Sequence, residues 1–427
     1  QYNIPSALKC PGEIDPRKLK EAVTAVLDAH PYIKTILAIE AGNLVQKRRD
    51  SLIADIMIKQ ATEEMMPAVC SHFVKPFNLF AENLFRFEIY RTEAHTWLLM
   101  DMHHIVFDGL SVSVFLNDLT KAFNNEPVAP EVFTAFDVAL EEEKILASGR
   151  FAEAEAYFDL LMEGTAMSVF PPSPYVTAGS SAGESVAHIP AAQVNDFCRK
   201  YGVTVNAFFL SVLCQVVQRY TREPRVALTM ASGGRSDNRL SNTFGMFVKT
   251  LPVVADCSKN MAFVEFARNI QEQTFSTIEN EIFPYTRMVE KYGIVPQINY
   301  VYEGGLDLEL ALNGHKAEIR SLELDTVKFP FGIVVEPHGN HYSMTVQSDP
   351  KQYACPDTER FCHIFAVTAS AMASSPELPA RSFSLLDEQD RKQILDFSRG
   401  EELNYERQTT FIDLFRENVK KYTDRPA

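Results

Sequence analysis

The segment from residue 97 to residue 111 reads Trp97-Leu-Leu-Met-Asp-Met-His-His-Ile-Val-Phe-Asp-Gly-Leu-Ser111. Its first six residues are mostly apolar, which predicts a buried strand. Two histidines, His103 and His104, follow this run, and Asp108-Gly109 comes before a helical period begins. The segment therefore predicts a strand, a turn that carries ionisable side chains, and a helix.

The two adjacent histidines suit proton transfer. Side chains alternate between the faces of a strand, so the two imidazoles point in opposite directions if the strand continues through the pair. His104 would then share a face with Met100 and Met102. His103 would share the opposite face with Asp101. Because an imidazole gains or loses a proton near neutral pH, we expect one histidine to face a channel and the other to be held from behind. A pair of structural histidines is the alternative interpretation.

Asp108 lies where a turn meets a predicted helix. The apolar stripe of that helix consists of Val112, Phe115, Leu116, Leu119 and Phe123. An aspartate beside glycine at such a turn usually stays ionised and hydrogen-bonded. We therefore expect Asp108 to cap the helix or to hold a cation that fixes the loop, rather than to transfer protons.

The composition predicts large apolar cores and argues against a nucleic-acid partner. The chain has 427 residues, of which 46% are hydrophobic and 30 are phenylalanine. This length exceeds what one hydrophobic core usually serves, so we expect two domains or subdomains. The formal net charge of −15 would repel a polyanion such as nucleic acid.

Cysteine usage and hydropathy favour a cytoplasmic protein. Seven cysteines are scattered without the spacing of a metal site, and reduced thiols are the simplest account of their odd number. No apolar run approaches the length of a membrane span, and no signal peptide is visible. We expect no membrane partner and no metal. Because the sequence starts at Gln1 rather than methionine, we expect it to be a piece of a longer polypeptide.

Composition divides the chain into three parts. The segment Pro171–Gly183 is rich in Pro, Gly, Ser and Ala, which marks the clearest internal boundary. From Arg391 the composition becomes more polar, and Thr409–Tyr422 is predicted to be an amphipathic helix. We therefore expect subdomains at residues 1–174 and 175–390, followed by a separate segment at 391–427.

Several motifs resemble those of one enzyme family. His103-His-Ile-Val-Phe-Asp-Gly109 matches the HHxxxDG motif of condensation domains of nonribosomal peptide synthetases. Wax-ester and acylglycerol acyltransferases also use this motif, so the ordered set of further motifs is more specific. Ser232-Gly-Gly-Arg235 resembles the family's SGR loop. Phe244-Gly-Met-Phe-Val-Lys-Thr-Leu-Pro252 resembles its GxFVNT motif, with Lys249 where asparagine is usual, and Asn280–Tyr285 resembles a QDYPFE-like motif.

The family's second motif, RHExLRT, is matched less well. It corresponds to Ala29-His-Pro-Tyr-Ile-Lys-Thr35, in which Ala29 and Lys34 replace two arginines and Pro31 replaces the glutamate. Lys34 keeps a positive charge but lacks the forked geometry of a guanidinium. The family's first motif is not seen. The resemblance nevertheless covers nearly the whole chain, with its motifs in order.

The resemblance implies an α/β (α+β) fold of two chloramphenicol-acetyltransferase-like subdomains, arranged as a V with a central tunnel. It implies amide formation between a donor acyl or peptidyl thioester and an acceptor aminoacyl thioester. Donor and acceptor peptidyl carrier proteins supply both on phosphopantetheine arms, so the domain itself binds no cofactor. Residues 391–427 resemble the linker and first helix toward an adenylation domain of the same polypeptide. That helix usually ends near a Pro-Ala pair such as Pro426-Ala427.

The resemblance also implies roles for individual residues. His104 takes the amine proton or hydrogen-bonds the attacking nitrogen, and the sequence does not separate these roles. His103 supports it, and the backbone N–H of Gly109 helps to stabilise the developing oxyanion. Asp108 orders the loop and pairs with Arg235 across the subdomain interface. A solvated loop charge is the alternative for Arg235. Substrate-binding residues and the joined amino acids are not specified by one sequence.

Two other functions remain open. One is a non-catalytic carrier-docking or recruitment domain of the same fold, and the other is a free-standing acyltransferase that uses acyl-CoA. The intact histidine–aspartate motif favours catalysis, and the linker-like C-terminus argues against the acyl-CoA enzyme. The departures at Ala29, Pro31, Lys34 and Lys249 keep a docking role open. Within the family, the two histidines argue against a cyclisation domain, and we expect an L-configured donor.

Overall fold

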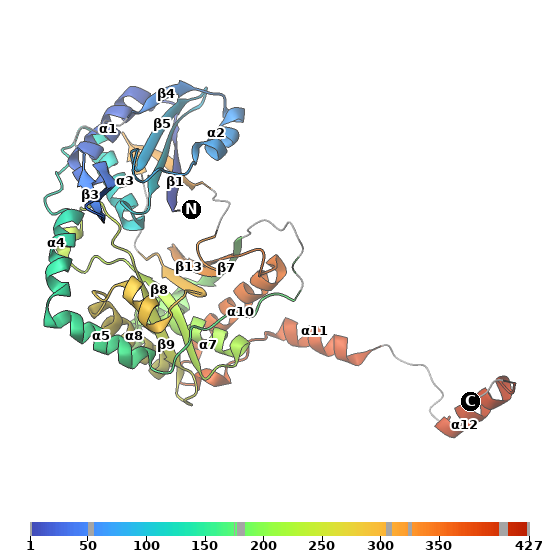
Figure 1. Ribbon diagram of the computed structural model, residues 1–427. Helices are drawn as coiled ribbons and strands as arrows, with labels where there is room; N and C mark the ends of the chain where they lie inside the picture. The colour runs from blue at the N-terminus through green and yellow to red at the C-terminus, as the bar shows by residue number, and fades with distance from the viewer. Residues whose placement is uncertain are drawn as a thin grey trace. The chain divides into compact units, whose positions relative to one another are not determined.

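Two six-stranded sheets organise the structure, which is a computed structural model (Figure 1). It describes residues 2–49, 55–174, 176, 184–304, 310–322, 327–400 and 409–424. By their contacts, the residues fall into two compact units, one that ends at Phe383 and one that begins at Ser384.

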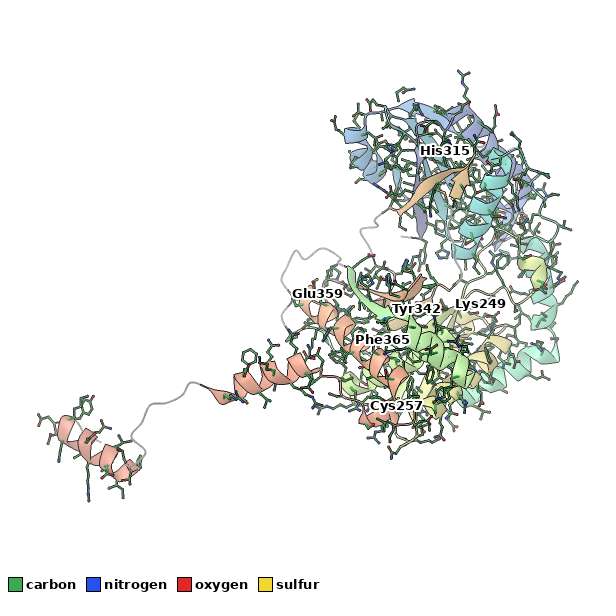
Figure 2. The ribbon with its side chains drawn as sticks, turned by 180° about the vertical axis from the view of Figure 1, so that it is seen from behind. Lys249, Cys257, His315, Tyr342, Glu359 and Phe365 are labelled. Atoms are coloured by element: carbon green, nitrogen blue, oxygen red, sulfur yellow. The ribbon has the colours of Figure 1, made fainter. Side chains whose placement is uncertain are left out.

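The first sheet contains strands from both halves of the sequence. Its order is β11-β12-β1-β6-β5-β4. The strands are β1 (Asn3–Pro11), β4 (Met57–Gln60), β5 (Phe85–Arg91), β6 (His95–His103), β11 (Leu310–Leu312) and β12 (His315–Ser321). β1 is antiparallel to both β6 and β12, whereas β4 is parallel to β5 at the edge. Figure 2 labels His315 where β12 begins, among elements of the first half.

Both faces of the predicted central strand are buried, and its side chains alternate as expected. Met100 and Met102 of β6 join a core with helices α1 (Pro16–Ala29) and α3 (Gly109–Phe123). Trp97 of the same strand belongs to a smaller cluster with α2 (Met66–Phe73) on the other face.

The remaining elements of the first half include a capped helix and short segments. Asp15 accepts a hydrogen bond from the backbone N–H of Arg17 and so caps α1, in which Pro16 is the first residue. A separate hairpin and two 3₁₀ turns complete this half: β2 (Thr35–Glu40), β3 (Asn43–Arg48), η1 (Pro31–Lys34) and η2 (Glu63–Met65).

The second sheet has the order β7-β14-β13-β10-β8-β9. Its strands are β7 (Glu184–Pro190), β8 (Arg225–Ser232), β9 (Lys249–Asp256), β10 (Ile298–Tyr302), β13 (Phe331–His338) and β14 (His341–Ser348). β10 runs parallel to both β8 and β13, and the other pairs are antiparallel. β13 and β14 are joined by a hairpin turn at Gly339-Asn340, across which His338 pairs with His341.

Helices cover the second sheet and lead into it. Those that pack with its strands are α6 (Ala191–Tyr201), α7 (Val205–Thr221), α8 (Phe263–Glu279), α9 (Tyr285–Tyr292) and α10 (Cys355–Ser374). α7 is buried along most of its length, as its apolar composition predicts, and Thr204 caps it by accepting from the Ala207 N–H. Figure 1 shows α7, α8 and α10 beside the strands of this sheet.

Two helices, α4 (Ala135–Leu146) and α5 (Gly149–Met162), lie in sequence between the strands of the two sheets. Pro171–Pro174 follow without regular structure. Most of the predicted boundary segment, including Tyr175 and residues 177–183, lies outside the described residues.

The described residues of the unit that begins at Ser384 form two helices. α12 (Phe411–Lys421) was predicted, whereas α11 (Glu388–Arg399) was not. The predicted boundary at residue 391 falls inside α11. The polar composition of this segment suggested a linker, but Asp387 and Asp390 form a capping box at which a helix begins. Residues 401–408 and the Pro426-Ala427 pair lie outside the described residues.

Among the described helices, none alone is long and apolar enough to cross a membrane. The pair α6 and α7 meets that criterion only jointly and is bent by 107° at its break.

Candidate functional site

The predicted catalytic pair sits at the end of β6. His103 is the last residue of the strand and pairs with Asn3 of β1. His104 already belongs to a turn, and its backbone N–H donates to the carbonyl of Tyr2 at 2.7 Å. The strand therefore ends at His103, whereas the predicted opposite directions of the two imidazoles required it to continue through His104. The turn, rather than strand alternation, determines the direction of the His104 imidazole.

His103 is held by its own loop. The backbone N–H of Ile105 donates to His103 Nδ1 at 3.1 Å, so in the neutral ring Nε2 carries the proton. Burial lowers the pKa of His103, and the neighbouring His104 lowers it further. The ring of Phe77 meets His103 edge-on at a centroid distance of 5.9 Å. These contacts fix a neutral imidazole in one orientation.

A buried carboxyl group lies on the same strand face as His103. Asp101 is fully buried, and its Oδ2 accepts from Asn3 Nδ2 at 2.8 Å and from Arg86 Nη1 at 2.9 Å. Burial outweighs these partners and raises the pKa of Asp101 to about 6. The Arg86 guanidinium lies over the ring of Phe77, 3.8 Å from its centroid. Asp101 and Arg86 therefore support the aromatic ring that contacts His103.

His104 is partly buried and kept neutral. Burial lowers its pKa below the ordinary 6.5, and the charge of Lys328 lowers it further. Hydrogen bonds to the main chain of His104 and Phe107, together with the charge of Asp108, act in the opposite direction without overcoming burial. A neutral imidazole has one ring nitrogen without a proton, and that nitrogen can accept a hydrogen bond.

Lys328 links His104 electrostatically to the second sheet. Desolvation by the surrounding protein lowers the pKa of Lys328, even though part of its side chain is exposed. The negative charge of Glu303 acts to raise the same pKa. Glu303 follows β10 and hydrogen-bonds Glu336 of the neighbouring β13. Burial and this second carboxyl group raise the pKa of Glu303 to about 7. His104 therefore lies in a field set by residues of both halves.

Asp108 is fully buried and has partners on both oxygens. It is the N-cap of α3, where Oδ1 accepts from the backbone N–H of Ser111 at 2.8 Å. The same oxygen accepts from Arg235 Nη2 at 3.0 Å, and Oδ2 accepts from the backbone N–H of Phe247 at 3.0 Å. Arg235 and Asp108, which the sequence analysis paired, are thus in contact. Asp108 also caps α3, which is one of the two roles predicted for it.

Residues 235–247 form a clasp over the start of α3. Arg235 donates from Nη1 to the carbonyls of Leu240 and Thr243, both at 2.7 Å, and from Nη2 to Ser111 Oγ at 2.9 Å. The backbone N–H of Gly245 donates to the same hydroxyl at 3.2 Å. Since Arg235 bonds the clasp and the cap together, it is more than a solvated loop charge.

One glycine before the clasp is required by its geometry. Gly234 has φ +62°, and a Cβ there would lie 1.9 Å from the carbonyl oxygen of Phe247. A larger residue would therefore push the SGR-like loop away from the clasp.

Gly109 is the first residue of α3, where backbone N–H groups have no acceptor within the helix. It is exposed, and a Cβ at this position would meet no atom within 4 Å. The space beside the helix N-terminus is therefore open to a substrate atom that carries negative charge.

Residues that differ from the family motifs have local ion-pair partners or suit the local backbone. Lys249 Nζ lies 2.9 Å from Glu142 Oε1 of α4, and Figure 2 shows Lys249 at the start of β9. Lys34 Nζ lies 2.7 Å from Asp28 Oδ1. Pro31 is the first residue of η1, where its missing N–H costs little.

Sequence reasoning missed several residues of this site. Ser111 bridges Asp108, Arg235 and the clasp, and a serine three residues after a helix cap gave no distinctive signal. Phe247 contributes through its backbone N–H, which a side-chain motif does not reveal. Lys328 lies far from the motif in sequence, so only the fold brings its charge to His104.

Comparison with known proteins identifies the family and the fold of the chain. The family model described as "Condensation domain" matches residues 1–395. Surfactin synthase subunit 1 of Bacillus subtilis (strain 168) is 22% identical over an alignment that covers 100% of this chain and 12% of the relative. Bacitracin synthase 2 of Bacillus licheniformis is 24% identical, with 100% and 17% covered. The chain thus spans less than a fifth of the length of these relatives.

Solved structures share the fold at low identity. A four-domain nonribosomal peptide synthetase bound to AMP and glycine aligns with a TM-score of 0.81 and 16% identity, covering 100% of this chain and 35% of that one. The X-domain from teicoplanin biosynthesis aligns with a TM-score of 0.79 and 18% identity, covering 90% and 93%. The predicted fold class, mixed α/β of the chloramphenicol-acetyltransferase-like kind, is confirmed. With the family model matched over nearly its whole length, the chain belongs to the condensation domains.

Proposed function

We propose that this domain forms an amide bond between a donor acyl or peptidyl thioester and the amine of an acceptor aminoacyl thioester. The observation that carries the proposal is the contrast within one loop. His104 presents a neutral imidazole, while Asp108 a few residues later is fixed by four hydrogen bonds. The membership of the chain in the condensation family supports the same reaction.

In the proposed mechanism the acceptor amine attacks the carbonyl carbon of the donor thioester. The C–N bond forms, the C–S bond breaks, and the donor arm leaves as a thiol. The unprotonated nitrogen of His104 accepts the amine proton or holds the attacking nitrogen by a hydrogen bond. No covalent intermediate with the protein is needed. His103 supports this arrangement, because its own Nδ1 is occupied by the Ile105 N–H.

Negative charge develops on the carbonyl oxygen during the attack. In this proposal the backbone N–H of Gly109, at the positive end of the α3 dipole, stabilises that oxygen. Asp108 and Arg235 act by holding the start of α3 rather than by exchanging protons. Much of the acceleration would come from the tethering of both reactants, since orientation converts an encounter in solution into an intramolecular step.

The partners follow from this reaction. Donor and acceptor carrier proteins deliver the substrates on phosphopantetheine arms, so that arm arrives with the substrate and the domain holds no cofactor of its own. We assign residues 1–174, together with β11 and β12, to one lobe and most of residues 175–383 to the other. The unit that begins at Ser384 is assigned to a linker toward an adenylation domain. A cytoplasmic location is part of the proposal, supported by seven cysteines that form no disulfide.

A docking domain without chemistry is the second candidate. One solved structure of the same fold, the X-domain from teicoplanin biosynthesis, was determined as a complex with the protein OxyB, which favours it. Against it stand the neutral imidazole of His104 and the open space at Gly109, because a docking surface needs neither of them.

The test is an intact-mass assay with a loaded donor carrier and a loaded acceptor carrier. The proposal expects the acceptor carrier to gain the mass of the donor acyl group, and the donor carrier to return to its free-thiol form. A matched reaction uses the acceptor carrier with its arm but without the amino acid, so that no amine is present. Acyl gain in that control would indicate transthiolation instead. Binding of both carriers without transfer, across a broad panel of loaded carriers, would favour the docking role.

A further inference from the structure

A buried ionic cluster lies behind the clasp, outside the site described above. His30 is fully buried at the end of α1, and its Nε2 lies 2.9 Å from Asp118 Oδ2. Its Nδ1 lies 3.6 Å from Glu131 Oε2. Both carboxylate side chains are fully buried, and Lys121 Nζ contacts Asp118 Oδ1 at 2.8 Å. Such a cluster is costly to bury, so its partners are tightly interdependent.

The charges of this cluster favour a protonated imidazole. Burial opposes the charged form, but the hydrogen bond to Asp118 and the charges of Glu131 and Asp118 outweigh it and raise the pKa of His30. The hydrogen bonds from His30 and Lys121 overcome burial and lower the pKa of Asp118. His30 is thus bound firmly to α3, the helix that carries Asp118.

The other side of the His30 ring supports the clasp. Phe244 stacks on His30 with a centroid distance of 3.9 Å and an interplanar angle of 13°. Phe107 packs edge-on against Phe244 at 5.0 Å, directly before Asp108 in the sequence. Phe244 belongs to the second half of the sequence but is fully buried in the core of the first.

His30 therefore touches both parts of the cap. Through Asp118 it holds α3 ten positions after its cap, about 15 Å along the helix axis. Through its stack with Phe244 it also holds the clasp. Gly245, the residue after Phe244, donates its backbone N–H to the Ser111 hydroxyl. A displaced imidazole would let the clasp and the helix move independently, and Asp108 lies where they meet.

We propose that His30 is a positioning residue for the amide-forming reaction. Held between Asp118 and Glu131, its ring supports Phe244 and so fixes the clasp that orders Asp108 and the His104 loop. This inference rests on the proposed function for its rate readout and on the clasp geometry for its structural readout.

The test compares His30→Gln with Phe244→Leu and with the double variant. His30→Gln removes the ring, whereas Phe244→Leu removes the stack without leaving a buried charge unpaired. We expect kcat to fall by about 10-fold to 100-fold in each, because small misplacements of reacting groups are costly. KM for the carriers should stay unchanged, since neither buried residue can touch them. The double variant should be little worse than the single ones, because both act through one contact.

Ser185→Ala is the matched control, because it also removes a buried hydrogen bond, 2.6 Å long, to Thr358 in the second sheet. It should lower the melting temperature without lowering kcat. Additive losses in the double variant, or a lowered melting temperature with unchanged kcat in both single variants, would overturn the inference. If His30→Gln does not fold, Phe244→Leu decides the question alone.

A second readout separates this inference from the proposed function. Hydrogen exchange at the backbone amides of Ser111 and Phe247 should be about 10-fold faster in both single variants than in Ser185→Ala. If the wild type forms no amide with any carrier, the proposed function fails, yet faster exchange would still support His30 as the support of the clasp. Unchanged exchange would overturn it.

Discussion

The two ends of the His103–Gly109 loop differ in how they are held. At one end, His104 is only partly buried, and burial lowers its pKa, so a neutral imidazole offers one unprotonated ring nitrogen. At the other end, Asp108 is fully buried and both of its oxygens are engaged by Ser111, Arg235 and Phe247. His104 is therefore the reactive end of the loop and Asp108 the rigid end. Substitution of His104 should lower the reaction rate, and substitution of Asp108 should lower the stability of the fold.

The largest effect on rate is expected for His104→Ala. Removal of a proton acceptor that acts in the transition state costs about 10²-fold to 10⁴-fold in kcat. The melting temperature should change little, because the backbone N–H of His104 still bonds Tyr2. Amide formation measured by intact mass at substrate saturation checks this. Near-normal turnover would remove His104 from the mechanism.

Asp108→Ala should damage the fold first. It leaves the nearly buried Arg235 without its carboxylate, and loss of one partner of a buried pair costs about 3–5 kcal/mol. Asp108→Asn should cost less, since the amide oxygen still accepts a hydrogen bond from Ser111 or Arg235. Urea unfolding followed by fluorescence measures both. A variant that is as stable as wild type but inactive would instead indicate that Asp108 takes part in the chemistry.

The pH dependence of the reaction should report the environment of His104. Because its pKa is lowered, the neutral imidazole persists as pH falls through 6.5, and kcat/KM should reach half its maximum below that value. Lys328→Gln removes the positive charge that favours the neutral form, so the acid limb should move to higher pH. Lys34→Gln, which removes a lysine paired with Asp28, is the control and should leave the limb in place. An unmoved limb in Lys328→Gln would show that burial alone sets the pKa.

The smallest effect is expected for Lys249→Asn, which restores the residue usual in the family motif. The ion pair of Lys249 with Glu142 is half-exposed, and such pairs contribute less than about 1 kcal/mol. We expect an unchanged rate and a melting temperature close to wild type. A large gain in rate would mean that this departure weakens catalysis in the natural sequence.

The fold was predictable from the sequence wherever local patterns dominate. The apolar run at β6, the cap of α3 at Asp108 and the amphipathic helix α12 follow from neighbouring residues. α11 was missed because its polar residues resemble a linker, although Asp387 and Asp390 form a capping box. The membership of β12 in the first sheet depends on pairing between Lys9 and Glu318, and no local pattern encodes such a distant pair.

The candidate site was predictable only in part for the same reason. The motif placed His103, His104 and Asp108, and the resemblance added Arg235. The direction of the His104 ring depends on where β6 ends, and its pKa depends on Lys328 from another part of the chain. Ser111 and the backbone N–H of Phe247 became recognisable only when the clasp and the helix were seen together.

The pairing of β12 with β1 has a consequence for synthesis of the protein. Until residues 315–321 leave the ribosome, β1 can pair with β6 but presents an unsatisfied edge on its other side. Such an edge invites association between nascent chains. Separate expression of a fragment that ends within residues 171–183 would make that exposure permanent. We therefore expect such a fragment to aggregate unless a peptide that contains β11 and β12 is supplied alongside it.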